Sequence, residues 1–269
     1  MKPYLSAIVL MGITLMSSTT TAAEAIASQQ CEQPKVIFFD VNETLLDLGN
    51  VADSVTHALD GRDDLVESWF TTMLHYSLVS NAIGDYHHFS DIGVAALQLV
   101  AQQHHIALTQ AEAKQAIAVP FGNLQPHQDV ISGLKRFQDM GIKLVTLTNS
   151  SDAGIKSQLL NAKLTPYFDD SLTVQTLQIF KPDLRVYQWA LKEMDVDAPQ
   201  SMLVAAHAWD IAGAAKAGMQ TAFIQRPGKH QLPLFGQADY TATDLITLAA
   251  QVCATTPPSL TTLDKHVDN

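Results

Sequence analysis

An aspartate that directly follows four apolar residues is the first position at which this chain could do chemistry. Residues 36–39, Val-Ile-Phe-Phe, have the pattern of a buried strand, with Asp40 at its carboxyl end and Thr44 four residues later. A carboxylate in this place, in front of a loop whose N–H groups can bind an anion, suits a nucleophile that attacks an anionic substrate. The competing interpretation is an acid that only caps a turn.

Three later segments also place polar side chains where predicted strands end. These groups are Thr148 and Asn149, then Lys181 in front of a proline, then Asp210. The carboxyl ends of parallel strands meet at one edge of a sheet, so we expect these side chains to gather around Asp40. Taken singly, Lys181 could instead be a solvated surface lysine, and Asp210 could be the N-cap of a helix.

The spacing of apolar residues divides the chain into two kinds of segment. After Asp47 they recur every three or four residues, which predicts helices over 51–59, 64–79, 92–105 and 109–119. From Pro126 onward, helices (128–140, 152–161, 183–194, 210–217) alternate with strands (143–148, 171–174, 202–206, 221–224). This alternation predicts an α/β fold, a Rossmann-like doubly wound parallel sheet core with an inserted all-helical cap domain. The core is assigned to residues 33–48 and 122–253, and the cap to residues 49–121.

The composition excludes some classes of partner. The chain has 269 residues, 47% of them hydrophobic, and a formal net charge of −11. A nucleic acid or an anionic membrane would require a basic face, so neither is expected as a partner. A small anionic substrate remains compatible with this charge, because a local positive pocket can bind it.

The two ends of the chain are predicted to lie outside the fold. Residues 1–27 have the pattern of a secretory signal peptide, with Lys2, an apolar run over 5–16 and small residues up to Ala27. That run is shorter than the roughly 20 residues of a membrane anchor, so a periplasmic or secreted protein is predicted, free of the membrane after cleavage. Residues 254–269 are predicted to form a flexible tail. In an oxidising compartment Cys31 and Cys253 could form a disulfide, and two free thiols are the alternative.

The order Asp40, Thr148, Lys181, Asp210, with a helical insertion after the first strand, resembles the haloacid dehalogenase superfamily. Its phosphatases place an aspartate general acid two residues after the nucleophile, where this chain has Asn42. A halide needs no proton in order to leave, so this change favours carbon–halogen cleavage. The segments that resemble the L-2-haloacid dehalogenases in particular are Lys181-Pro-Asp-Leu-Arg-Val-Tyr187, Ala208-Trp-Asp-Ile-Ala-Gly-Ala214 and the insertion stretch with Trp69, Leu74, Tyr76 and Phe89.

The chain also departs from that family. Phe70 stands where many members have an arginine that faces the leaving halide. Asn42 and Glu43 replace a tyrosine and a glycine, and Ala205 and His207 replace a serine and an asparagine. A minor branch of the family, to which this chain is similar, activates water with a Glu–His pair, which implies that role for Glu43 and His207. The alternative for His207 is a core or capping histidine.

The resemblance implies hydrolysis of short-chain L-2-haloalkanoic acids to 2-hydroxy acids through an ester on Asp40, with no metal and no cofactor. It implies that Lys181 keeps Asp40 ionised and that Asp210 fixes Lys181. The residues implied to bind the substrate carboxylate or to enclose the alkyl group and halide are Asn42, Thr148, Asn149, Phe70, Leu74, Phe89 and Trp209.

Two other functions stay open. One is a Mg²⁺-dependent phosphohydrolase of the same superfamily, with Asp40 and Asp210 as metal ligands, and the other is a non-catalytic relative that binds a carboxylate. The histidine pairs 87–88 and 104–105 have no acid or cysteine beside them at ligand spacing, so we expect solvated side chains there. A small-molecule 2-haloalkanoate is the expected partner, and the resemblance leaves a homodimer open.

Overall fold

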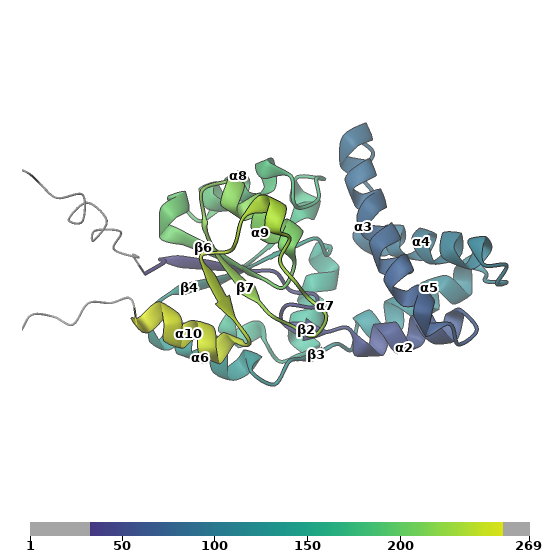
Figure 1. Cartoon of the computed structure of the whole chain (residues 1–269), viewed down its shortest axis with the longest axis horizontal. Helices are drawn as coiled ribbons and strands as arrows, with labels where there is room; N and C mark the ends of the chain where they lie inside the picture. The colour runs from purple at the N-terminus through teal and green to yellow at the C-terminus, as the bar shows by residue number, and fades with distance from the viewer. Residues whose placement is uncertain (1–32, 255–269) are drawn as a thin grey trace, which may run out of the picture. The chain divides into compact units, whose positions relative to one another are not determined.

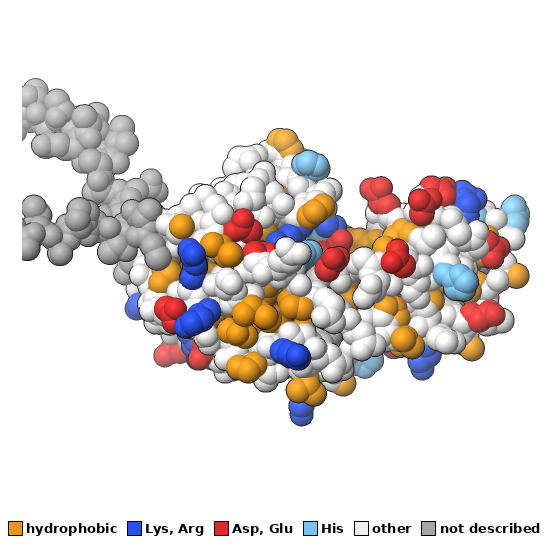
Figure 2. Space-filling model, turned by 90° about the horizontal axis from the view of Figure 1, so that it is seen from below, with side chains coloured by type: hydrophobic (Ala, Val, Ile, Leu, Met, Phe, Trp, Pro, Cys, Tyr) orange, Lys and Arg blue, Asp and Glu red, His pale blue; other side chains and the backbone are white. Residues whose placement is uncertain are grey.

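The computed structural model describes residues 33–254 (Figure 1). The predicted signal peptide, Cys31 and all but the first residue of the predicted tail lie outside the described residues, and so does the side chain of Cys253. The face drawn in Figure 2 carries basic and acidic side chains interspersed with apolar ones. In the described part of the chain, no helix is both long enough and apolar enough to cross a bilayer.

A parallel sheet of six strands forms the centre of the core, in the order β5-β4-β1-β6-β7-β8. The strands are β1 (Val36–Phe39), β4 (Lys143–Thr148), β5 (Asp170–Thr173), β6 (Ser201–Ala205), β7 (Gln220–Ile224) and β8 (Tyr240–Ala242). The first strand, β1, lies in the middle of the sheet. β4 and β5 follow on one side of it, and β6, β7 and β8 then form the other side. The strand order therefore reverses between β1 and β6, which is where such sheets bind their ligands. The predicted doubly wound sheet is confirmed.

Helices cover both faces of this sheet, α8 and α9 on one and α6 and α10 on the other (Figure 1). Their bounds, with that of α7, are α6 (Val130–Asp139), α7 (Asp152–Asn161), α8 (Leu184–Glu193), α9 (Ala208–Lys216) and α10 (Leu245–Ala254). Gly133 of α6 is needed for the close packing of α6 on α10, because a Cβ there would lie 2.3 Å from the Cβ of Leu245. The sheet is thus enclosed, as the continuous apolar runs of its central strands require.

The segment inserted after β1, from residue 49 to residue 121, is helical. It contains α2 (Gly49–Ala58), a 3₁₀ turn (Asp63–Leu65), α3 (Val66–Ile83), α4 (Phe89–Gln103) and α5 (Gln110–Phe121). A capping box begins α5, since the Thr109 side chain accepts from the Glu112 N–H and the Glu112 carboxylate accepts from the Thr109 N–H. On α4, Gly93 permits close contact with α3, where the Trp69 indole donates to the Gly93 carbonyl at 2.9 Å.

Three features differ from the sequence prediction. α3 continues four residues beyond 79 and ends at Gly84, which has a φ of 71°. Strand β8 was not predicted, and neither was a ribbon of β2 (Leu46–Asp47) with β3 (Gln125–Pro126), which joins the two connections between core and cap. Segments of two or three residues are too short to show a period, so only their pairing partners identify them.

Candidate active site

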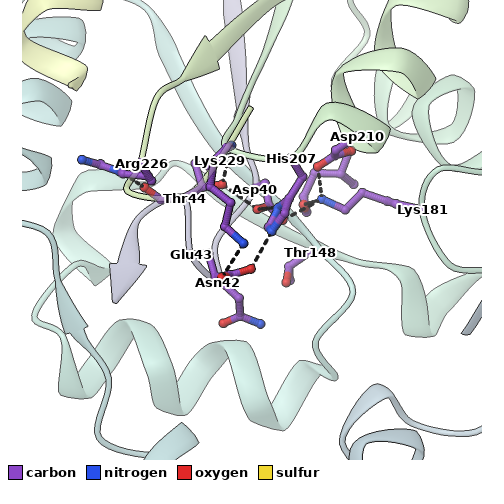
Figure 3. A network of polar contacts seen from close by, with 12 residues as sticks. Asp40, Asn42, Glu43, Thr44, Thr148, Lys181, His207, Asp210, Arg226 and Lys229 are labelled. Carbon is purple, nitrogen blue, oxygen red and sulfur yellow. Dashed lines mark hydrogen bonds and ion pairs between the residues drawn. The ribbon is translucent and has the colours of Figure 1, made fainter. Parts of the chain in front are cut away.

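The carboxyl edge of the sheet brings together the polar residues that the sequence singled out (Figure 3). β1 pairs with β4 and with β6, so the residues that follow these three strands are neighbours in space. Asp40 follows β1, Thr148 ends β4, and His207 follows β6. The site therefore lies at the edge of the sheet that the sequence predicted, at the point where the strand order reverses.

Three donors surround the buried carboxylate of Asp40. The Lys181 ammonium lies 2.9 Å from Oδ1, the Thr44 hydroxyl donates to Oδ2 at 2.7 Å, and Nδ1 of His207 lies 3.1 Å from Oδ2. Burial by itself would raise the pKa of Asp40, but the positive charge of Lys181 and the contact with His207 outweigh it and hold the pKa well below its usual range. Asp40 is therefore a carboxylate at any physiological pH.

Lys181 bridges Asp40 and Asp210 from a fully buried position. Its ammonium donates to Asp210 Oδ2 at 2.6 Å, to Asp40 Oδ1 at 2.9 Å and to the carbonyl of Leu147 at 2.7 Å, which uses all three N–H groups. Burial opposes its charge, yet the two carboxylates raise the pKa of Lys181 above its ordinary value. The other oxygen of Asp210 accepts from the Tyr187 hydroxyl at 2.5 Å, so Asp210 is fixed from both sides.

His207 is held between two carboxylates. Its Nδ1 faces Asp40, and its Nε2 lies 2.8 Å from Oε2 of Glu43. The rings of Phe70 and Trp209 stack near its imidazole, with centroids 6.4 and 5.0 Å away. Burial disfavours a charged ring, but the hydrogen bonds to Asp40 and Glu43 outweigh it and raise the pKa of His207 to about 9. His207 is therefore an imidazolium at neutral pH before any substrate reacts.

Glu43 adopts a left-handed backbone conformation, with a φ of 61°. A non-glycine residue there costs roughly 1–2 kcal/mol, so the surrounding contacts must maintain it. The carbonyl of Glu43 lies 3.1 Å from Nε2 of His127, and its Oε1 lies 2.6 Å from the ammonium of Lys229. Burial would raise the pKa of Glu43, but His207 and Lys229 lower it. Glu43 is consequently anionic and paired with two cations.

Lys229 is a site residue that the sequence prediction missed. It follows β7 in the segment Arg226-Pro-Gly-Lys229, at the same edge of the sheet as the predicted groups. Its place after a strand was the available signal. The side chains of Tyr187, Thr44 and Lys229 do not line the cavity. They contact the predicted residues Asp210, Asp40 and Glu43, respectively.

A small cavity of about 20 Å³ lies beside Asp40. All seven residues predicted to bind substrate line it: Asn42, Thr148, Asn149, Phe70, Leu74, Phe89 and Trp209. Leu48 and Phe121, which were not predicted, also line it. The cap supplies aromatic and aliphatic walls from α3, α4 and α5, and the core supplies the polar walls together with Trp209 of α9. A volume of this size holds about one water molecule, so binding of anything larger would require the residues that line the cavity to move.

The polar residues of the cavity wall are fixed by their neighbours. Asn42 donates to the Ser150 hydroxyl at 3.2 Å and accepts from the Gln158 amide at 3.0 Å. The Thr148 hydroxyl accepts from the Ser150 N–H, and Oδ1 of Asn149 accepts from the Lys181 N–H. Asn42 therefore acts as an anchored amide and carries no proton that it could give to a leaving group.

The side chains of Asp40 and Asp210 do not form a metal site. The ammonium of Lys181 lies between them and forms an ion pair with each. Across residues 33–254, no cluster of three or more His, Cys, Asp or Glu side chains is arranged to hold a metal ion. The donor set thus suits a lysine-bridged carboxylate pair rather than Mg²⁺.

Known proteins resemble this chain in sequence and in fold. The chain is 30% identical over 196 residues to the (S)-2-haloacid dehalogenase of Pseudomonas sp. (strain YL) and 27% identical over 191 residues to that of Pseudomonas putida, covering 84% of each relative and 72% and 71% of this chain. A crystal structure of a dehalogenase with an intermediate complex matches with a TM-score of 0.72 at 25% identity, over 82% of this chain and 97% of that one. The L-2-haloacid dehalogenase of Xanthobacter autotrophicus with covalently bound chloropropionic acid shares the fold, with a TM-score of 0.75 at 20% identity. This match covers 82% of this chain and 98% of that one. The family model of the haloacid dehalogenase-like hydrolases matches residues 34–218, so the chain belongs to that family.

Proposed function

We propose that this protein hydrolyses short L-2-haloalkanoic acids to 2-hydroxy acids through an ester on Asp40. The observation that carries the proposal is a buried, ionised carboxylate that borders an aromatic-walled cavity and is held by Lys181. The relatives named (S)-2-haloacid dehalogenases support the same reaction. Asn42 and the lysine bridge to Asp210 disfavour a metal-dependent phosphohydrolase.

In the first step, Asp40 attacks C2 of the substrate from the side opposite the halogen. The C–O bond of the ester forms as the carbon–halogen bond breaks, and the halide leaves with the bonding electron pair. Thr148 and the N–H groups near Asn42 and Asn149 line the cavity where the substrate carboxylate would be received. Displacement from the rear inverts the configuration at C2.

The second step depends on a change in the charge of His207. Once Asp40 is an ester, it is neutral, and His207 faces the single anion Glu43. The pKa of His207 then falls from about 9 towards its ordinary value, since one of the two groups that raise it has lost its charge. The imidazolium then releases its proton to solvent. The neutral imidazole accepts a proton from water, whose oxygen attacks the ester carbonyl. The products are the inverted hydroxy acid and the restored carboxylate.

Halide release in the presence of EDTA tests the reaction class. With L-2-chloropropionate we expect stoichiometric chloride and D-lactate, unchanged by EDTA, and no hydrolysis of p-nitrophenyl phosphate. EDTA-sensitive hydrolysis of the phosphate would identify a phosphohydrolase instead. Binding of the haloacid without any turnover would identify a non-catalytic relative.

The ester is tested by mass spectrometry of the His207→Ala protein after incubation with bromoacetate. We expect one bromide per protein and an adduct located on Asp40, because formation of the ester does not require the base whereas its hydrolysis does. Asp40→Asn should give neither. Bromide release at a steady rate with an unmodified Asp40 would contradict the ester route.

A further inference from the structure

Six charged side chains of alternating sign form one continuous chain of contacts through the site (Figure 3). In order they are Asp210, Lys181, Asp40, His207, Glu43 and Lys229. Consecutive members are separated by 2.6, 2.9, 3.1, 2.8 and 2.6 Å. The side chain at one end, Asp210, is fully buried, whereas that of Lys229 at the other end is 24% exposed. The proposed reaction leaves Lys229 without a role.

Lys229 contacts both the core and the cap. Its ammonium pairs with Oε1 of Glu43 and lies 5.4 Å from the centroid of the Phe70 ring on α3. Phe70 in turn stacks near His207. Lys229 is not among the residues that line the cavity beside Asp40, whereas Phe70 and His207 are. The lysine therefore reaches the site through Glu43 and Phe70 and does not border the space for the substrate.

We propose that Lys229 is a positioning residue that fixes the carboxylate of Glu43 and limits how tightly His207 holds its proton. This inference rests on the proposed function, because it concerns the water-activating pair of that reaction. Each carboxylate oxygen of Glu43 has its own cation, Oε2 with His207 and Oε1 with Lys229. The orientation that faces His207 is thereby defined.

The electrostatic reason lies in the sharing of one negative charge between two cations. In the ester form, Glu43 is the anion that stabilises the imidazolium of His207. Lys229 lies against the same carboxylate and opposes a second positive charge nearby, so His207 can release its proton at a lower pH. Without Lys229, the charge of Glu43 would act on His207 alone and retain the proton.

The other charged groups around Glu43 do not supply the same effect. His127 contacts its backbone carbonyl, and burial and Arg226 lower the pKa of His127, so this ring is neutral at neutral pH. Arg226 is bound to both carboxylate oxygens of Asp129 at 2.7 and 3.0 Å. The contacts of the cap with this part of the site come from uncharged residues such as Phe70.

The test compares Lys229→Met with Lys229→Arg, and uses Lys216→Met, an exposed lysine of α9, as the matched control. Steady-state rates with L-2-chloropropionate are measured from pH 5.5 to 9.5, and the ester on Asp40 is quantified by quenching and mass spectrometry. For Lys229→Met we expect the rise of kcat with pH to move about one unit towards higher pH, a roughly tenfold lower kcat at pH 7 and accumulation of the ester. KM should stay within about twofold, and Lys229→Arg should restore the profile.

Three results would overturn the inference. They are a pH profile of Lys229→Met that coincides with that of Lys216→Met, a shift towards lower pH, and a raised KM with an unchanged profile, which would make Lys229 a substrate-binding cation. A wild-type protein that releases no halide would refute the proposed function itself. Thermal unfolding of each variant verifies that a lost rate does not reflect a lost fold.

Discussion

At the scale of single residues, the site is organised by which groups carry charge before and after the nucleophile reacts. Asp40 is ionised because Lys181 and His207 stabilise its charge, and His207 is protonated because Asp40 and Glu43 stabilise its own. The sequence predicted a Glu–His pair that works as a base near neutral pH. Because Asp40 and Glu43 raise the pKa of His207 to about 9, the proposed role as a base requires that Asp40 first lose its charge.

Glu43→Gln should lower the pKa of His207, because an amide cannot stabilise the imidazolium as a carboxylate does. We expect a fall of about one unit or more from a value of about 9. The ring resonances of His207, followed by NMR in a ¹⁵N-labelled protein across the pH range, report this directly. Glu67→Gln removes an exposed carboxylate of α3 and should leave the titration unchanged. An equal pKa in wild type and Glu43→Gln would mean that Glu43 does not act on His207.

The raised pKa of His207 also makes stability depend on pH. The pKa of His207 is about 9 in the folded protein and 6.5 in the unfolded chain. Protonation of His207 therefore stabilises the fold fully below pH 6.5, and this stabilisation is lost as the pH rises through 9. We expect wild type to lose about 3 kcal/mol more unfolding free energy than His207→Gln between these limits, as measured by urea denaturation. Parallel pH dependences of the two proteins would show that His207 titrates normally in the fold.

At the scale of secondary-structure elements, β1 and β6 supply the two residues that face each other across the reversal of strand order, Asp40 and His207. α9 begins directly after His207 and carries Asp210 in its first turn. Its packing against α8 brings Tyr187 into hydrogen-bond distance of Asp210. The position of α9 relative to α8 therefore determines whether the lysine bridge is assembled.

Gly213→Ala tests this packing. A Cβ at Gly213 would lie 2.5 Å from the ring and hydroxyl of Tyr187, so α8 and α9 must separate or Tyr187 must turn away. We expect a loss of about 1–3 kcal/mol of unfolding free energy, together with a lower kcat. Gly49→Ala is the matched control, because its Cβ would meet no atom closer than 3.4 Å. A Gly213→Ala protein with wild-type stability would show that the two helices can adapt freely.

At the scale of the whole molecule, the reaction needs both the core and the cap. The core provides the charges and the wall formed by Trp209, the cap provides most of the other apolar walls, and neither set encloses the cavity alone. Two hydrogen bonds tie α3 to the loop before Lys181: the Asn81 side chain donates to the Phe180 carbonyl and accepts from the Phe180 N–H, at 2.9 and 2.8 Å. Binding of a substrate in a cavity of about 20 Å³ would require the residues that line it to move.

We propose that the protein is exported, on the basis of the pattern of residues 1–27. Expressed in a bacterial host, the chain should appear in the periplasmic fraction with a new N-terminus after Ala23, Ala25 or Ala27. N-terminal sequencing measures this, and Leu10→Arg, which interrupts the apolar run, should leave the full-length chain in the cytoplasm. A wild-type protein that retains Met1 and stays in the cytoplasm would contradict export.

The sequence was sufficient to predict the type of fold and to name most of the residues that lie together at the candidate site. Apolar periods identify strands such as β4 and helices such as α7 at their observed bounds, because each is long enough to show its period. Asp40, Lys181 and Asp210 follow strands or short loops at one edge, so their meeting could be inferred from the topology of a parallel sheet.

The tertiary structure alone decided how the site is charged and how much space it leaves. The lysine bridge, the protonation of His207 and the second cation on Glu43 all depend on contacts between residues far apart in the chain. Coulombic energies vary with distances of a few ångströms and with burial, and neither can be read from spacing along a sequence. For the same reason the sequence did not show which partner Lys229 would have, although its place after β7 indicated the edge of the sheet at which it lies.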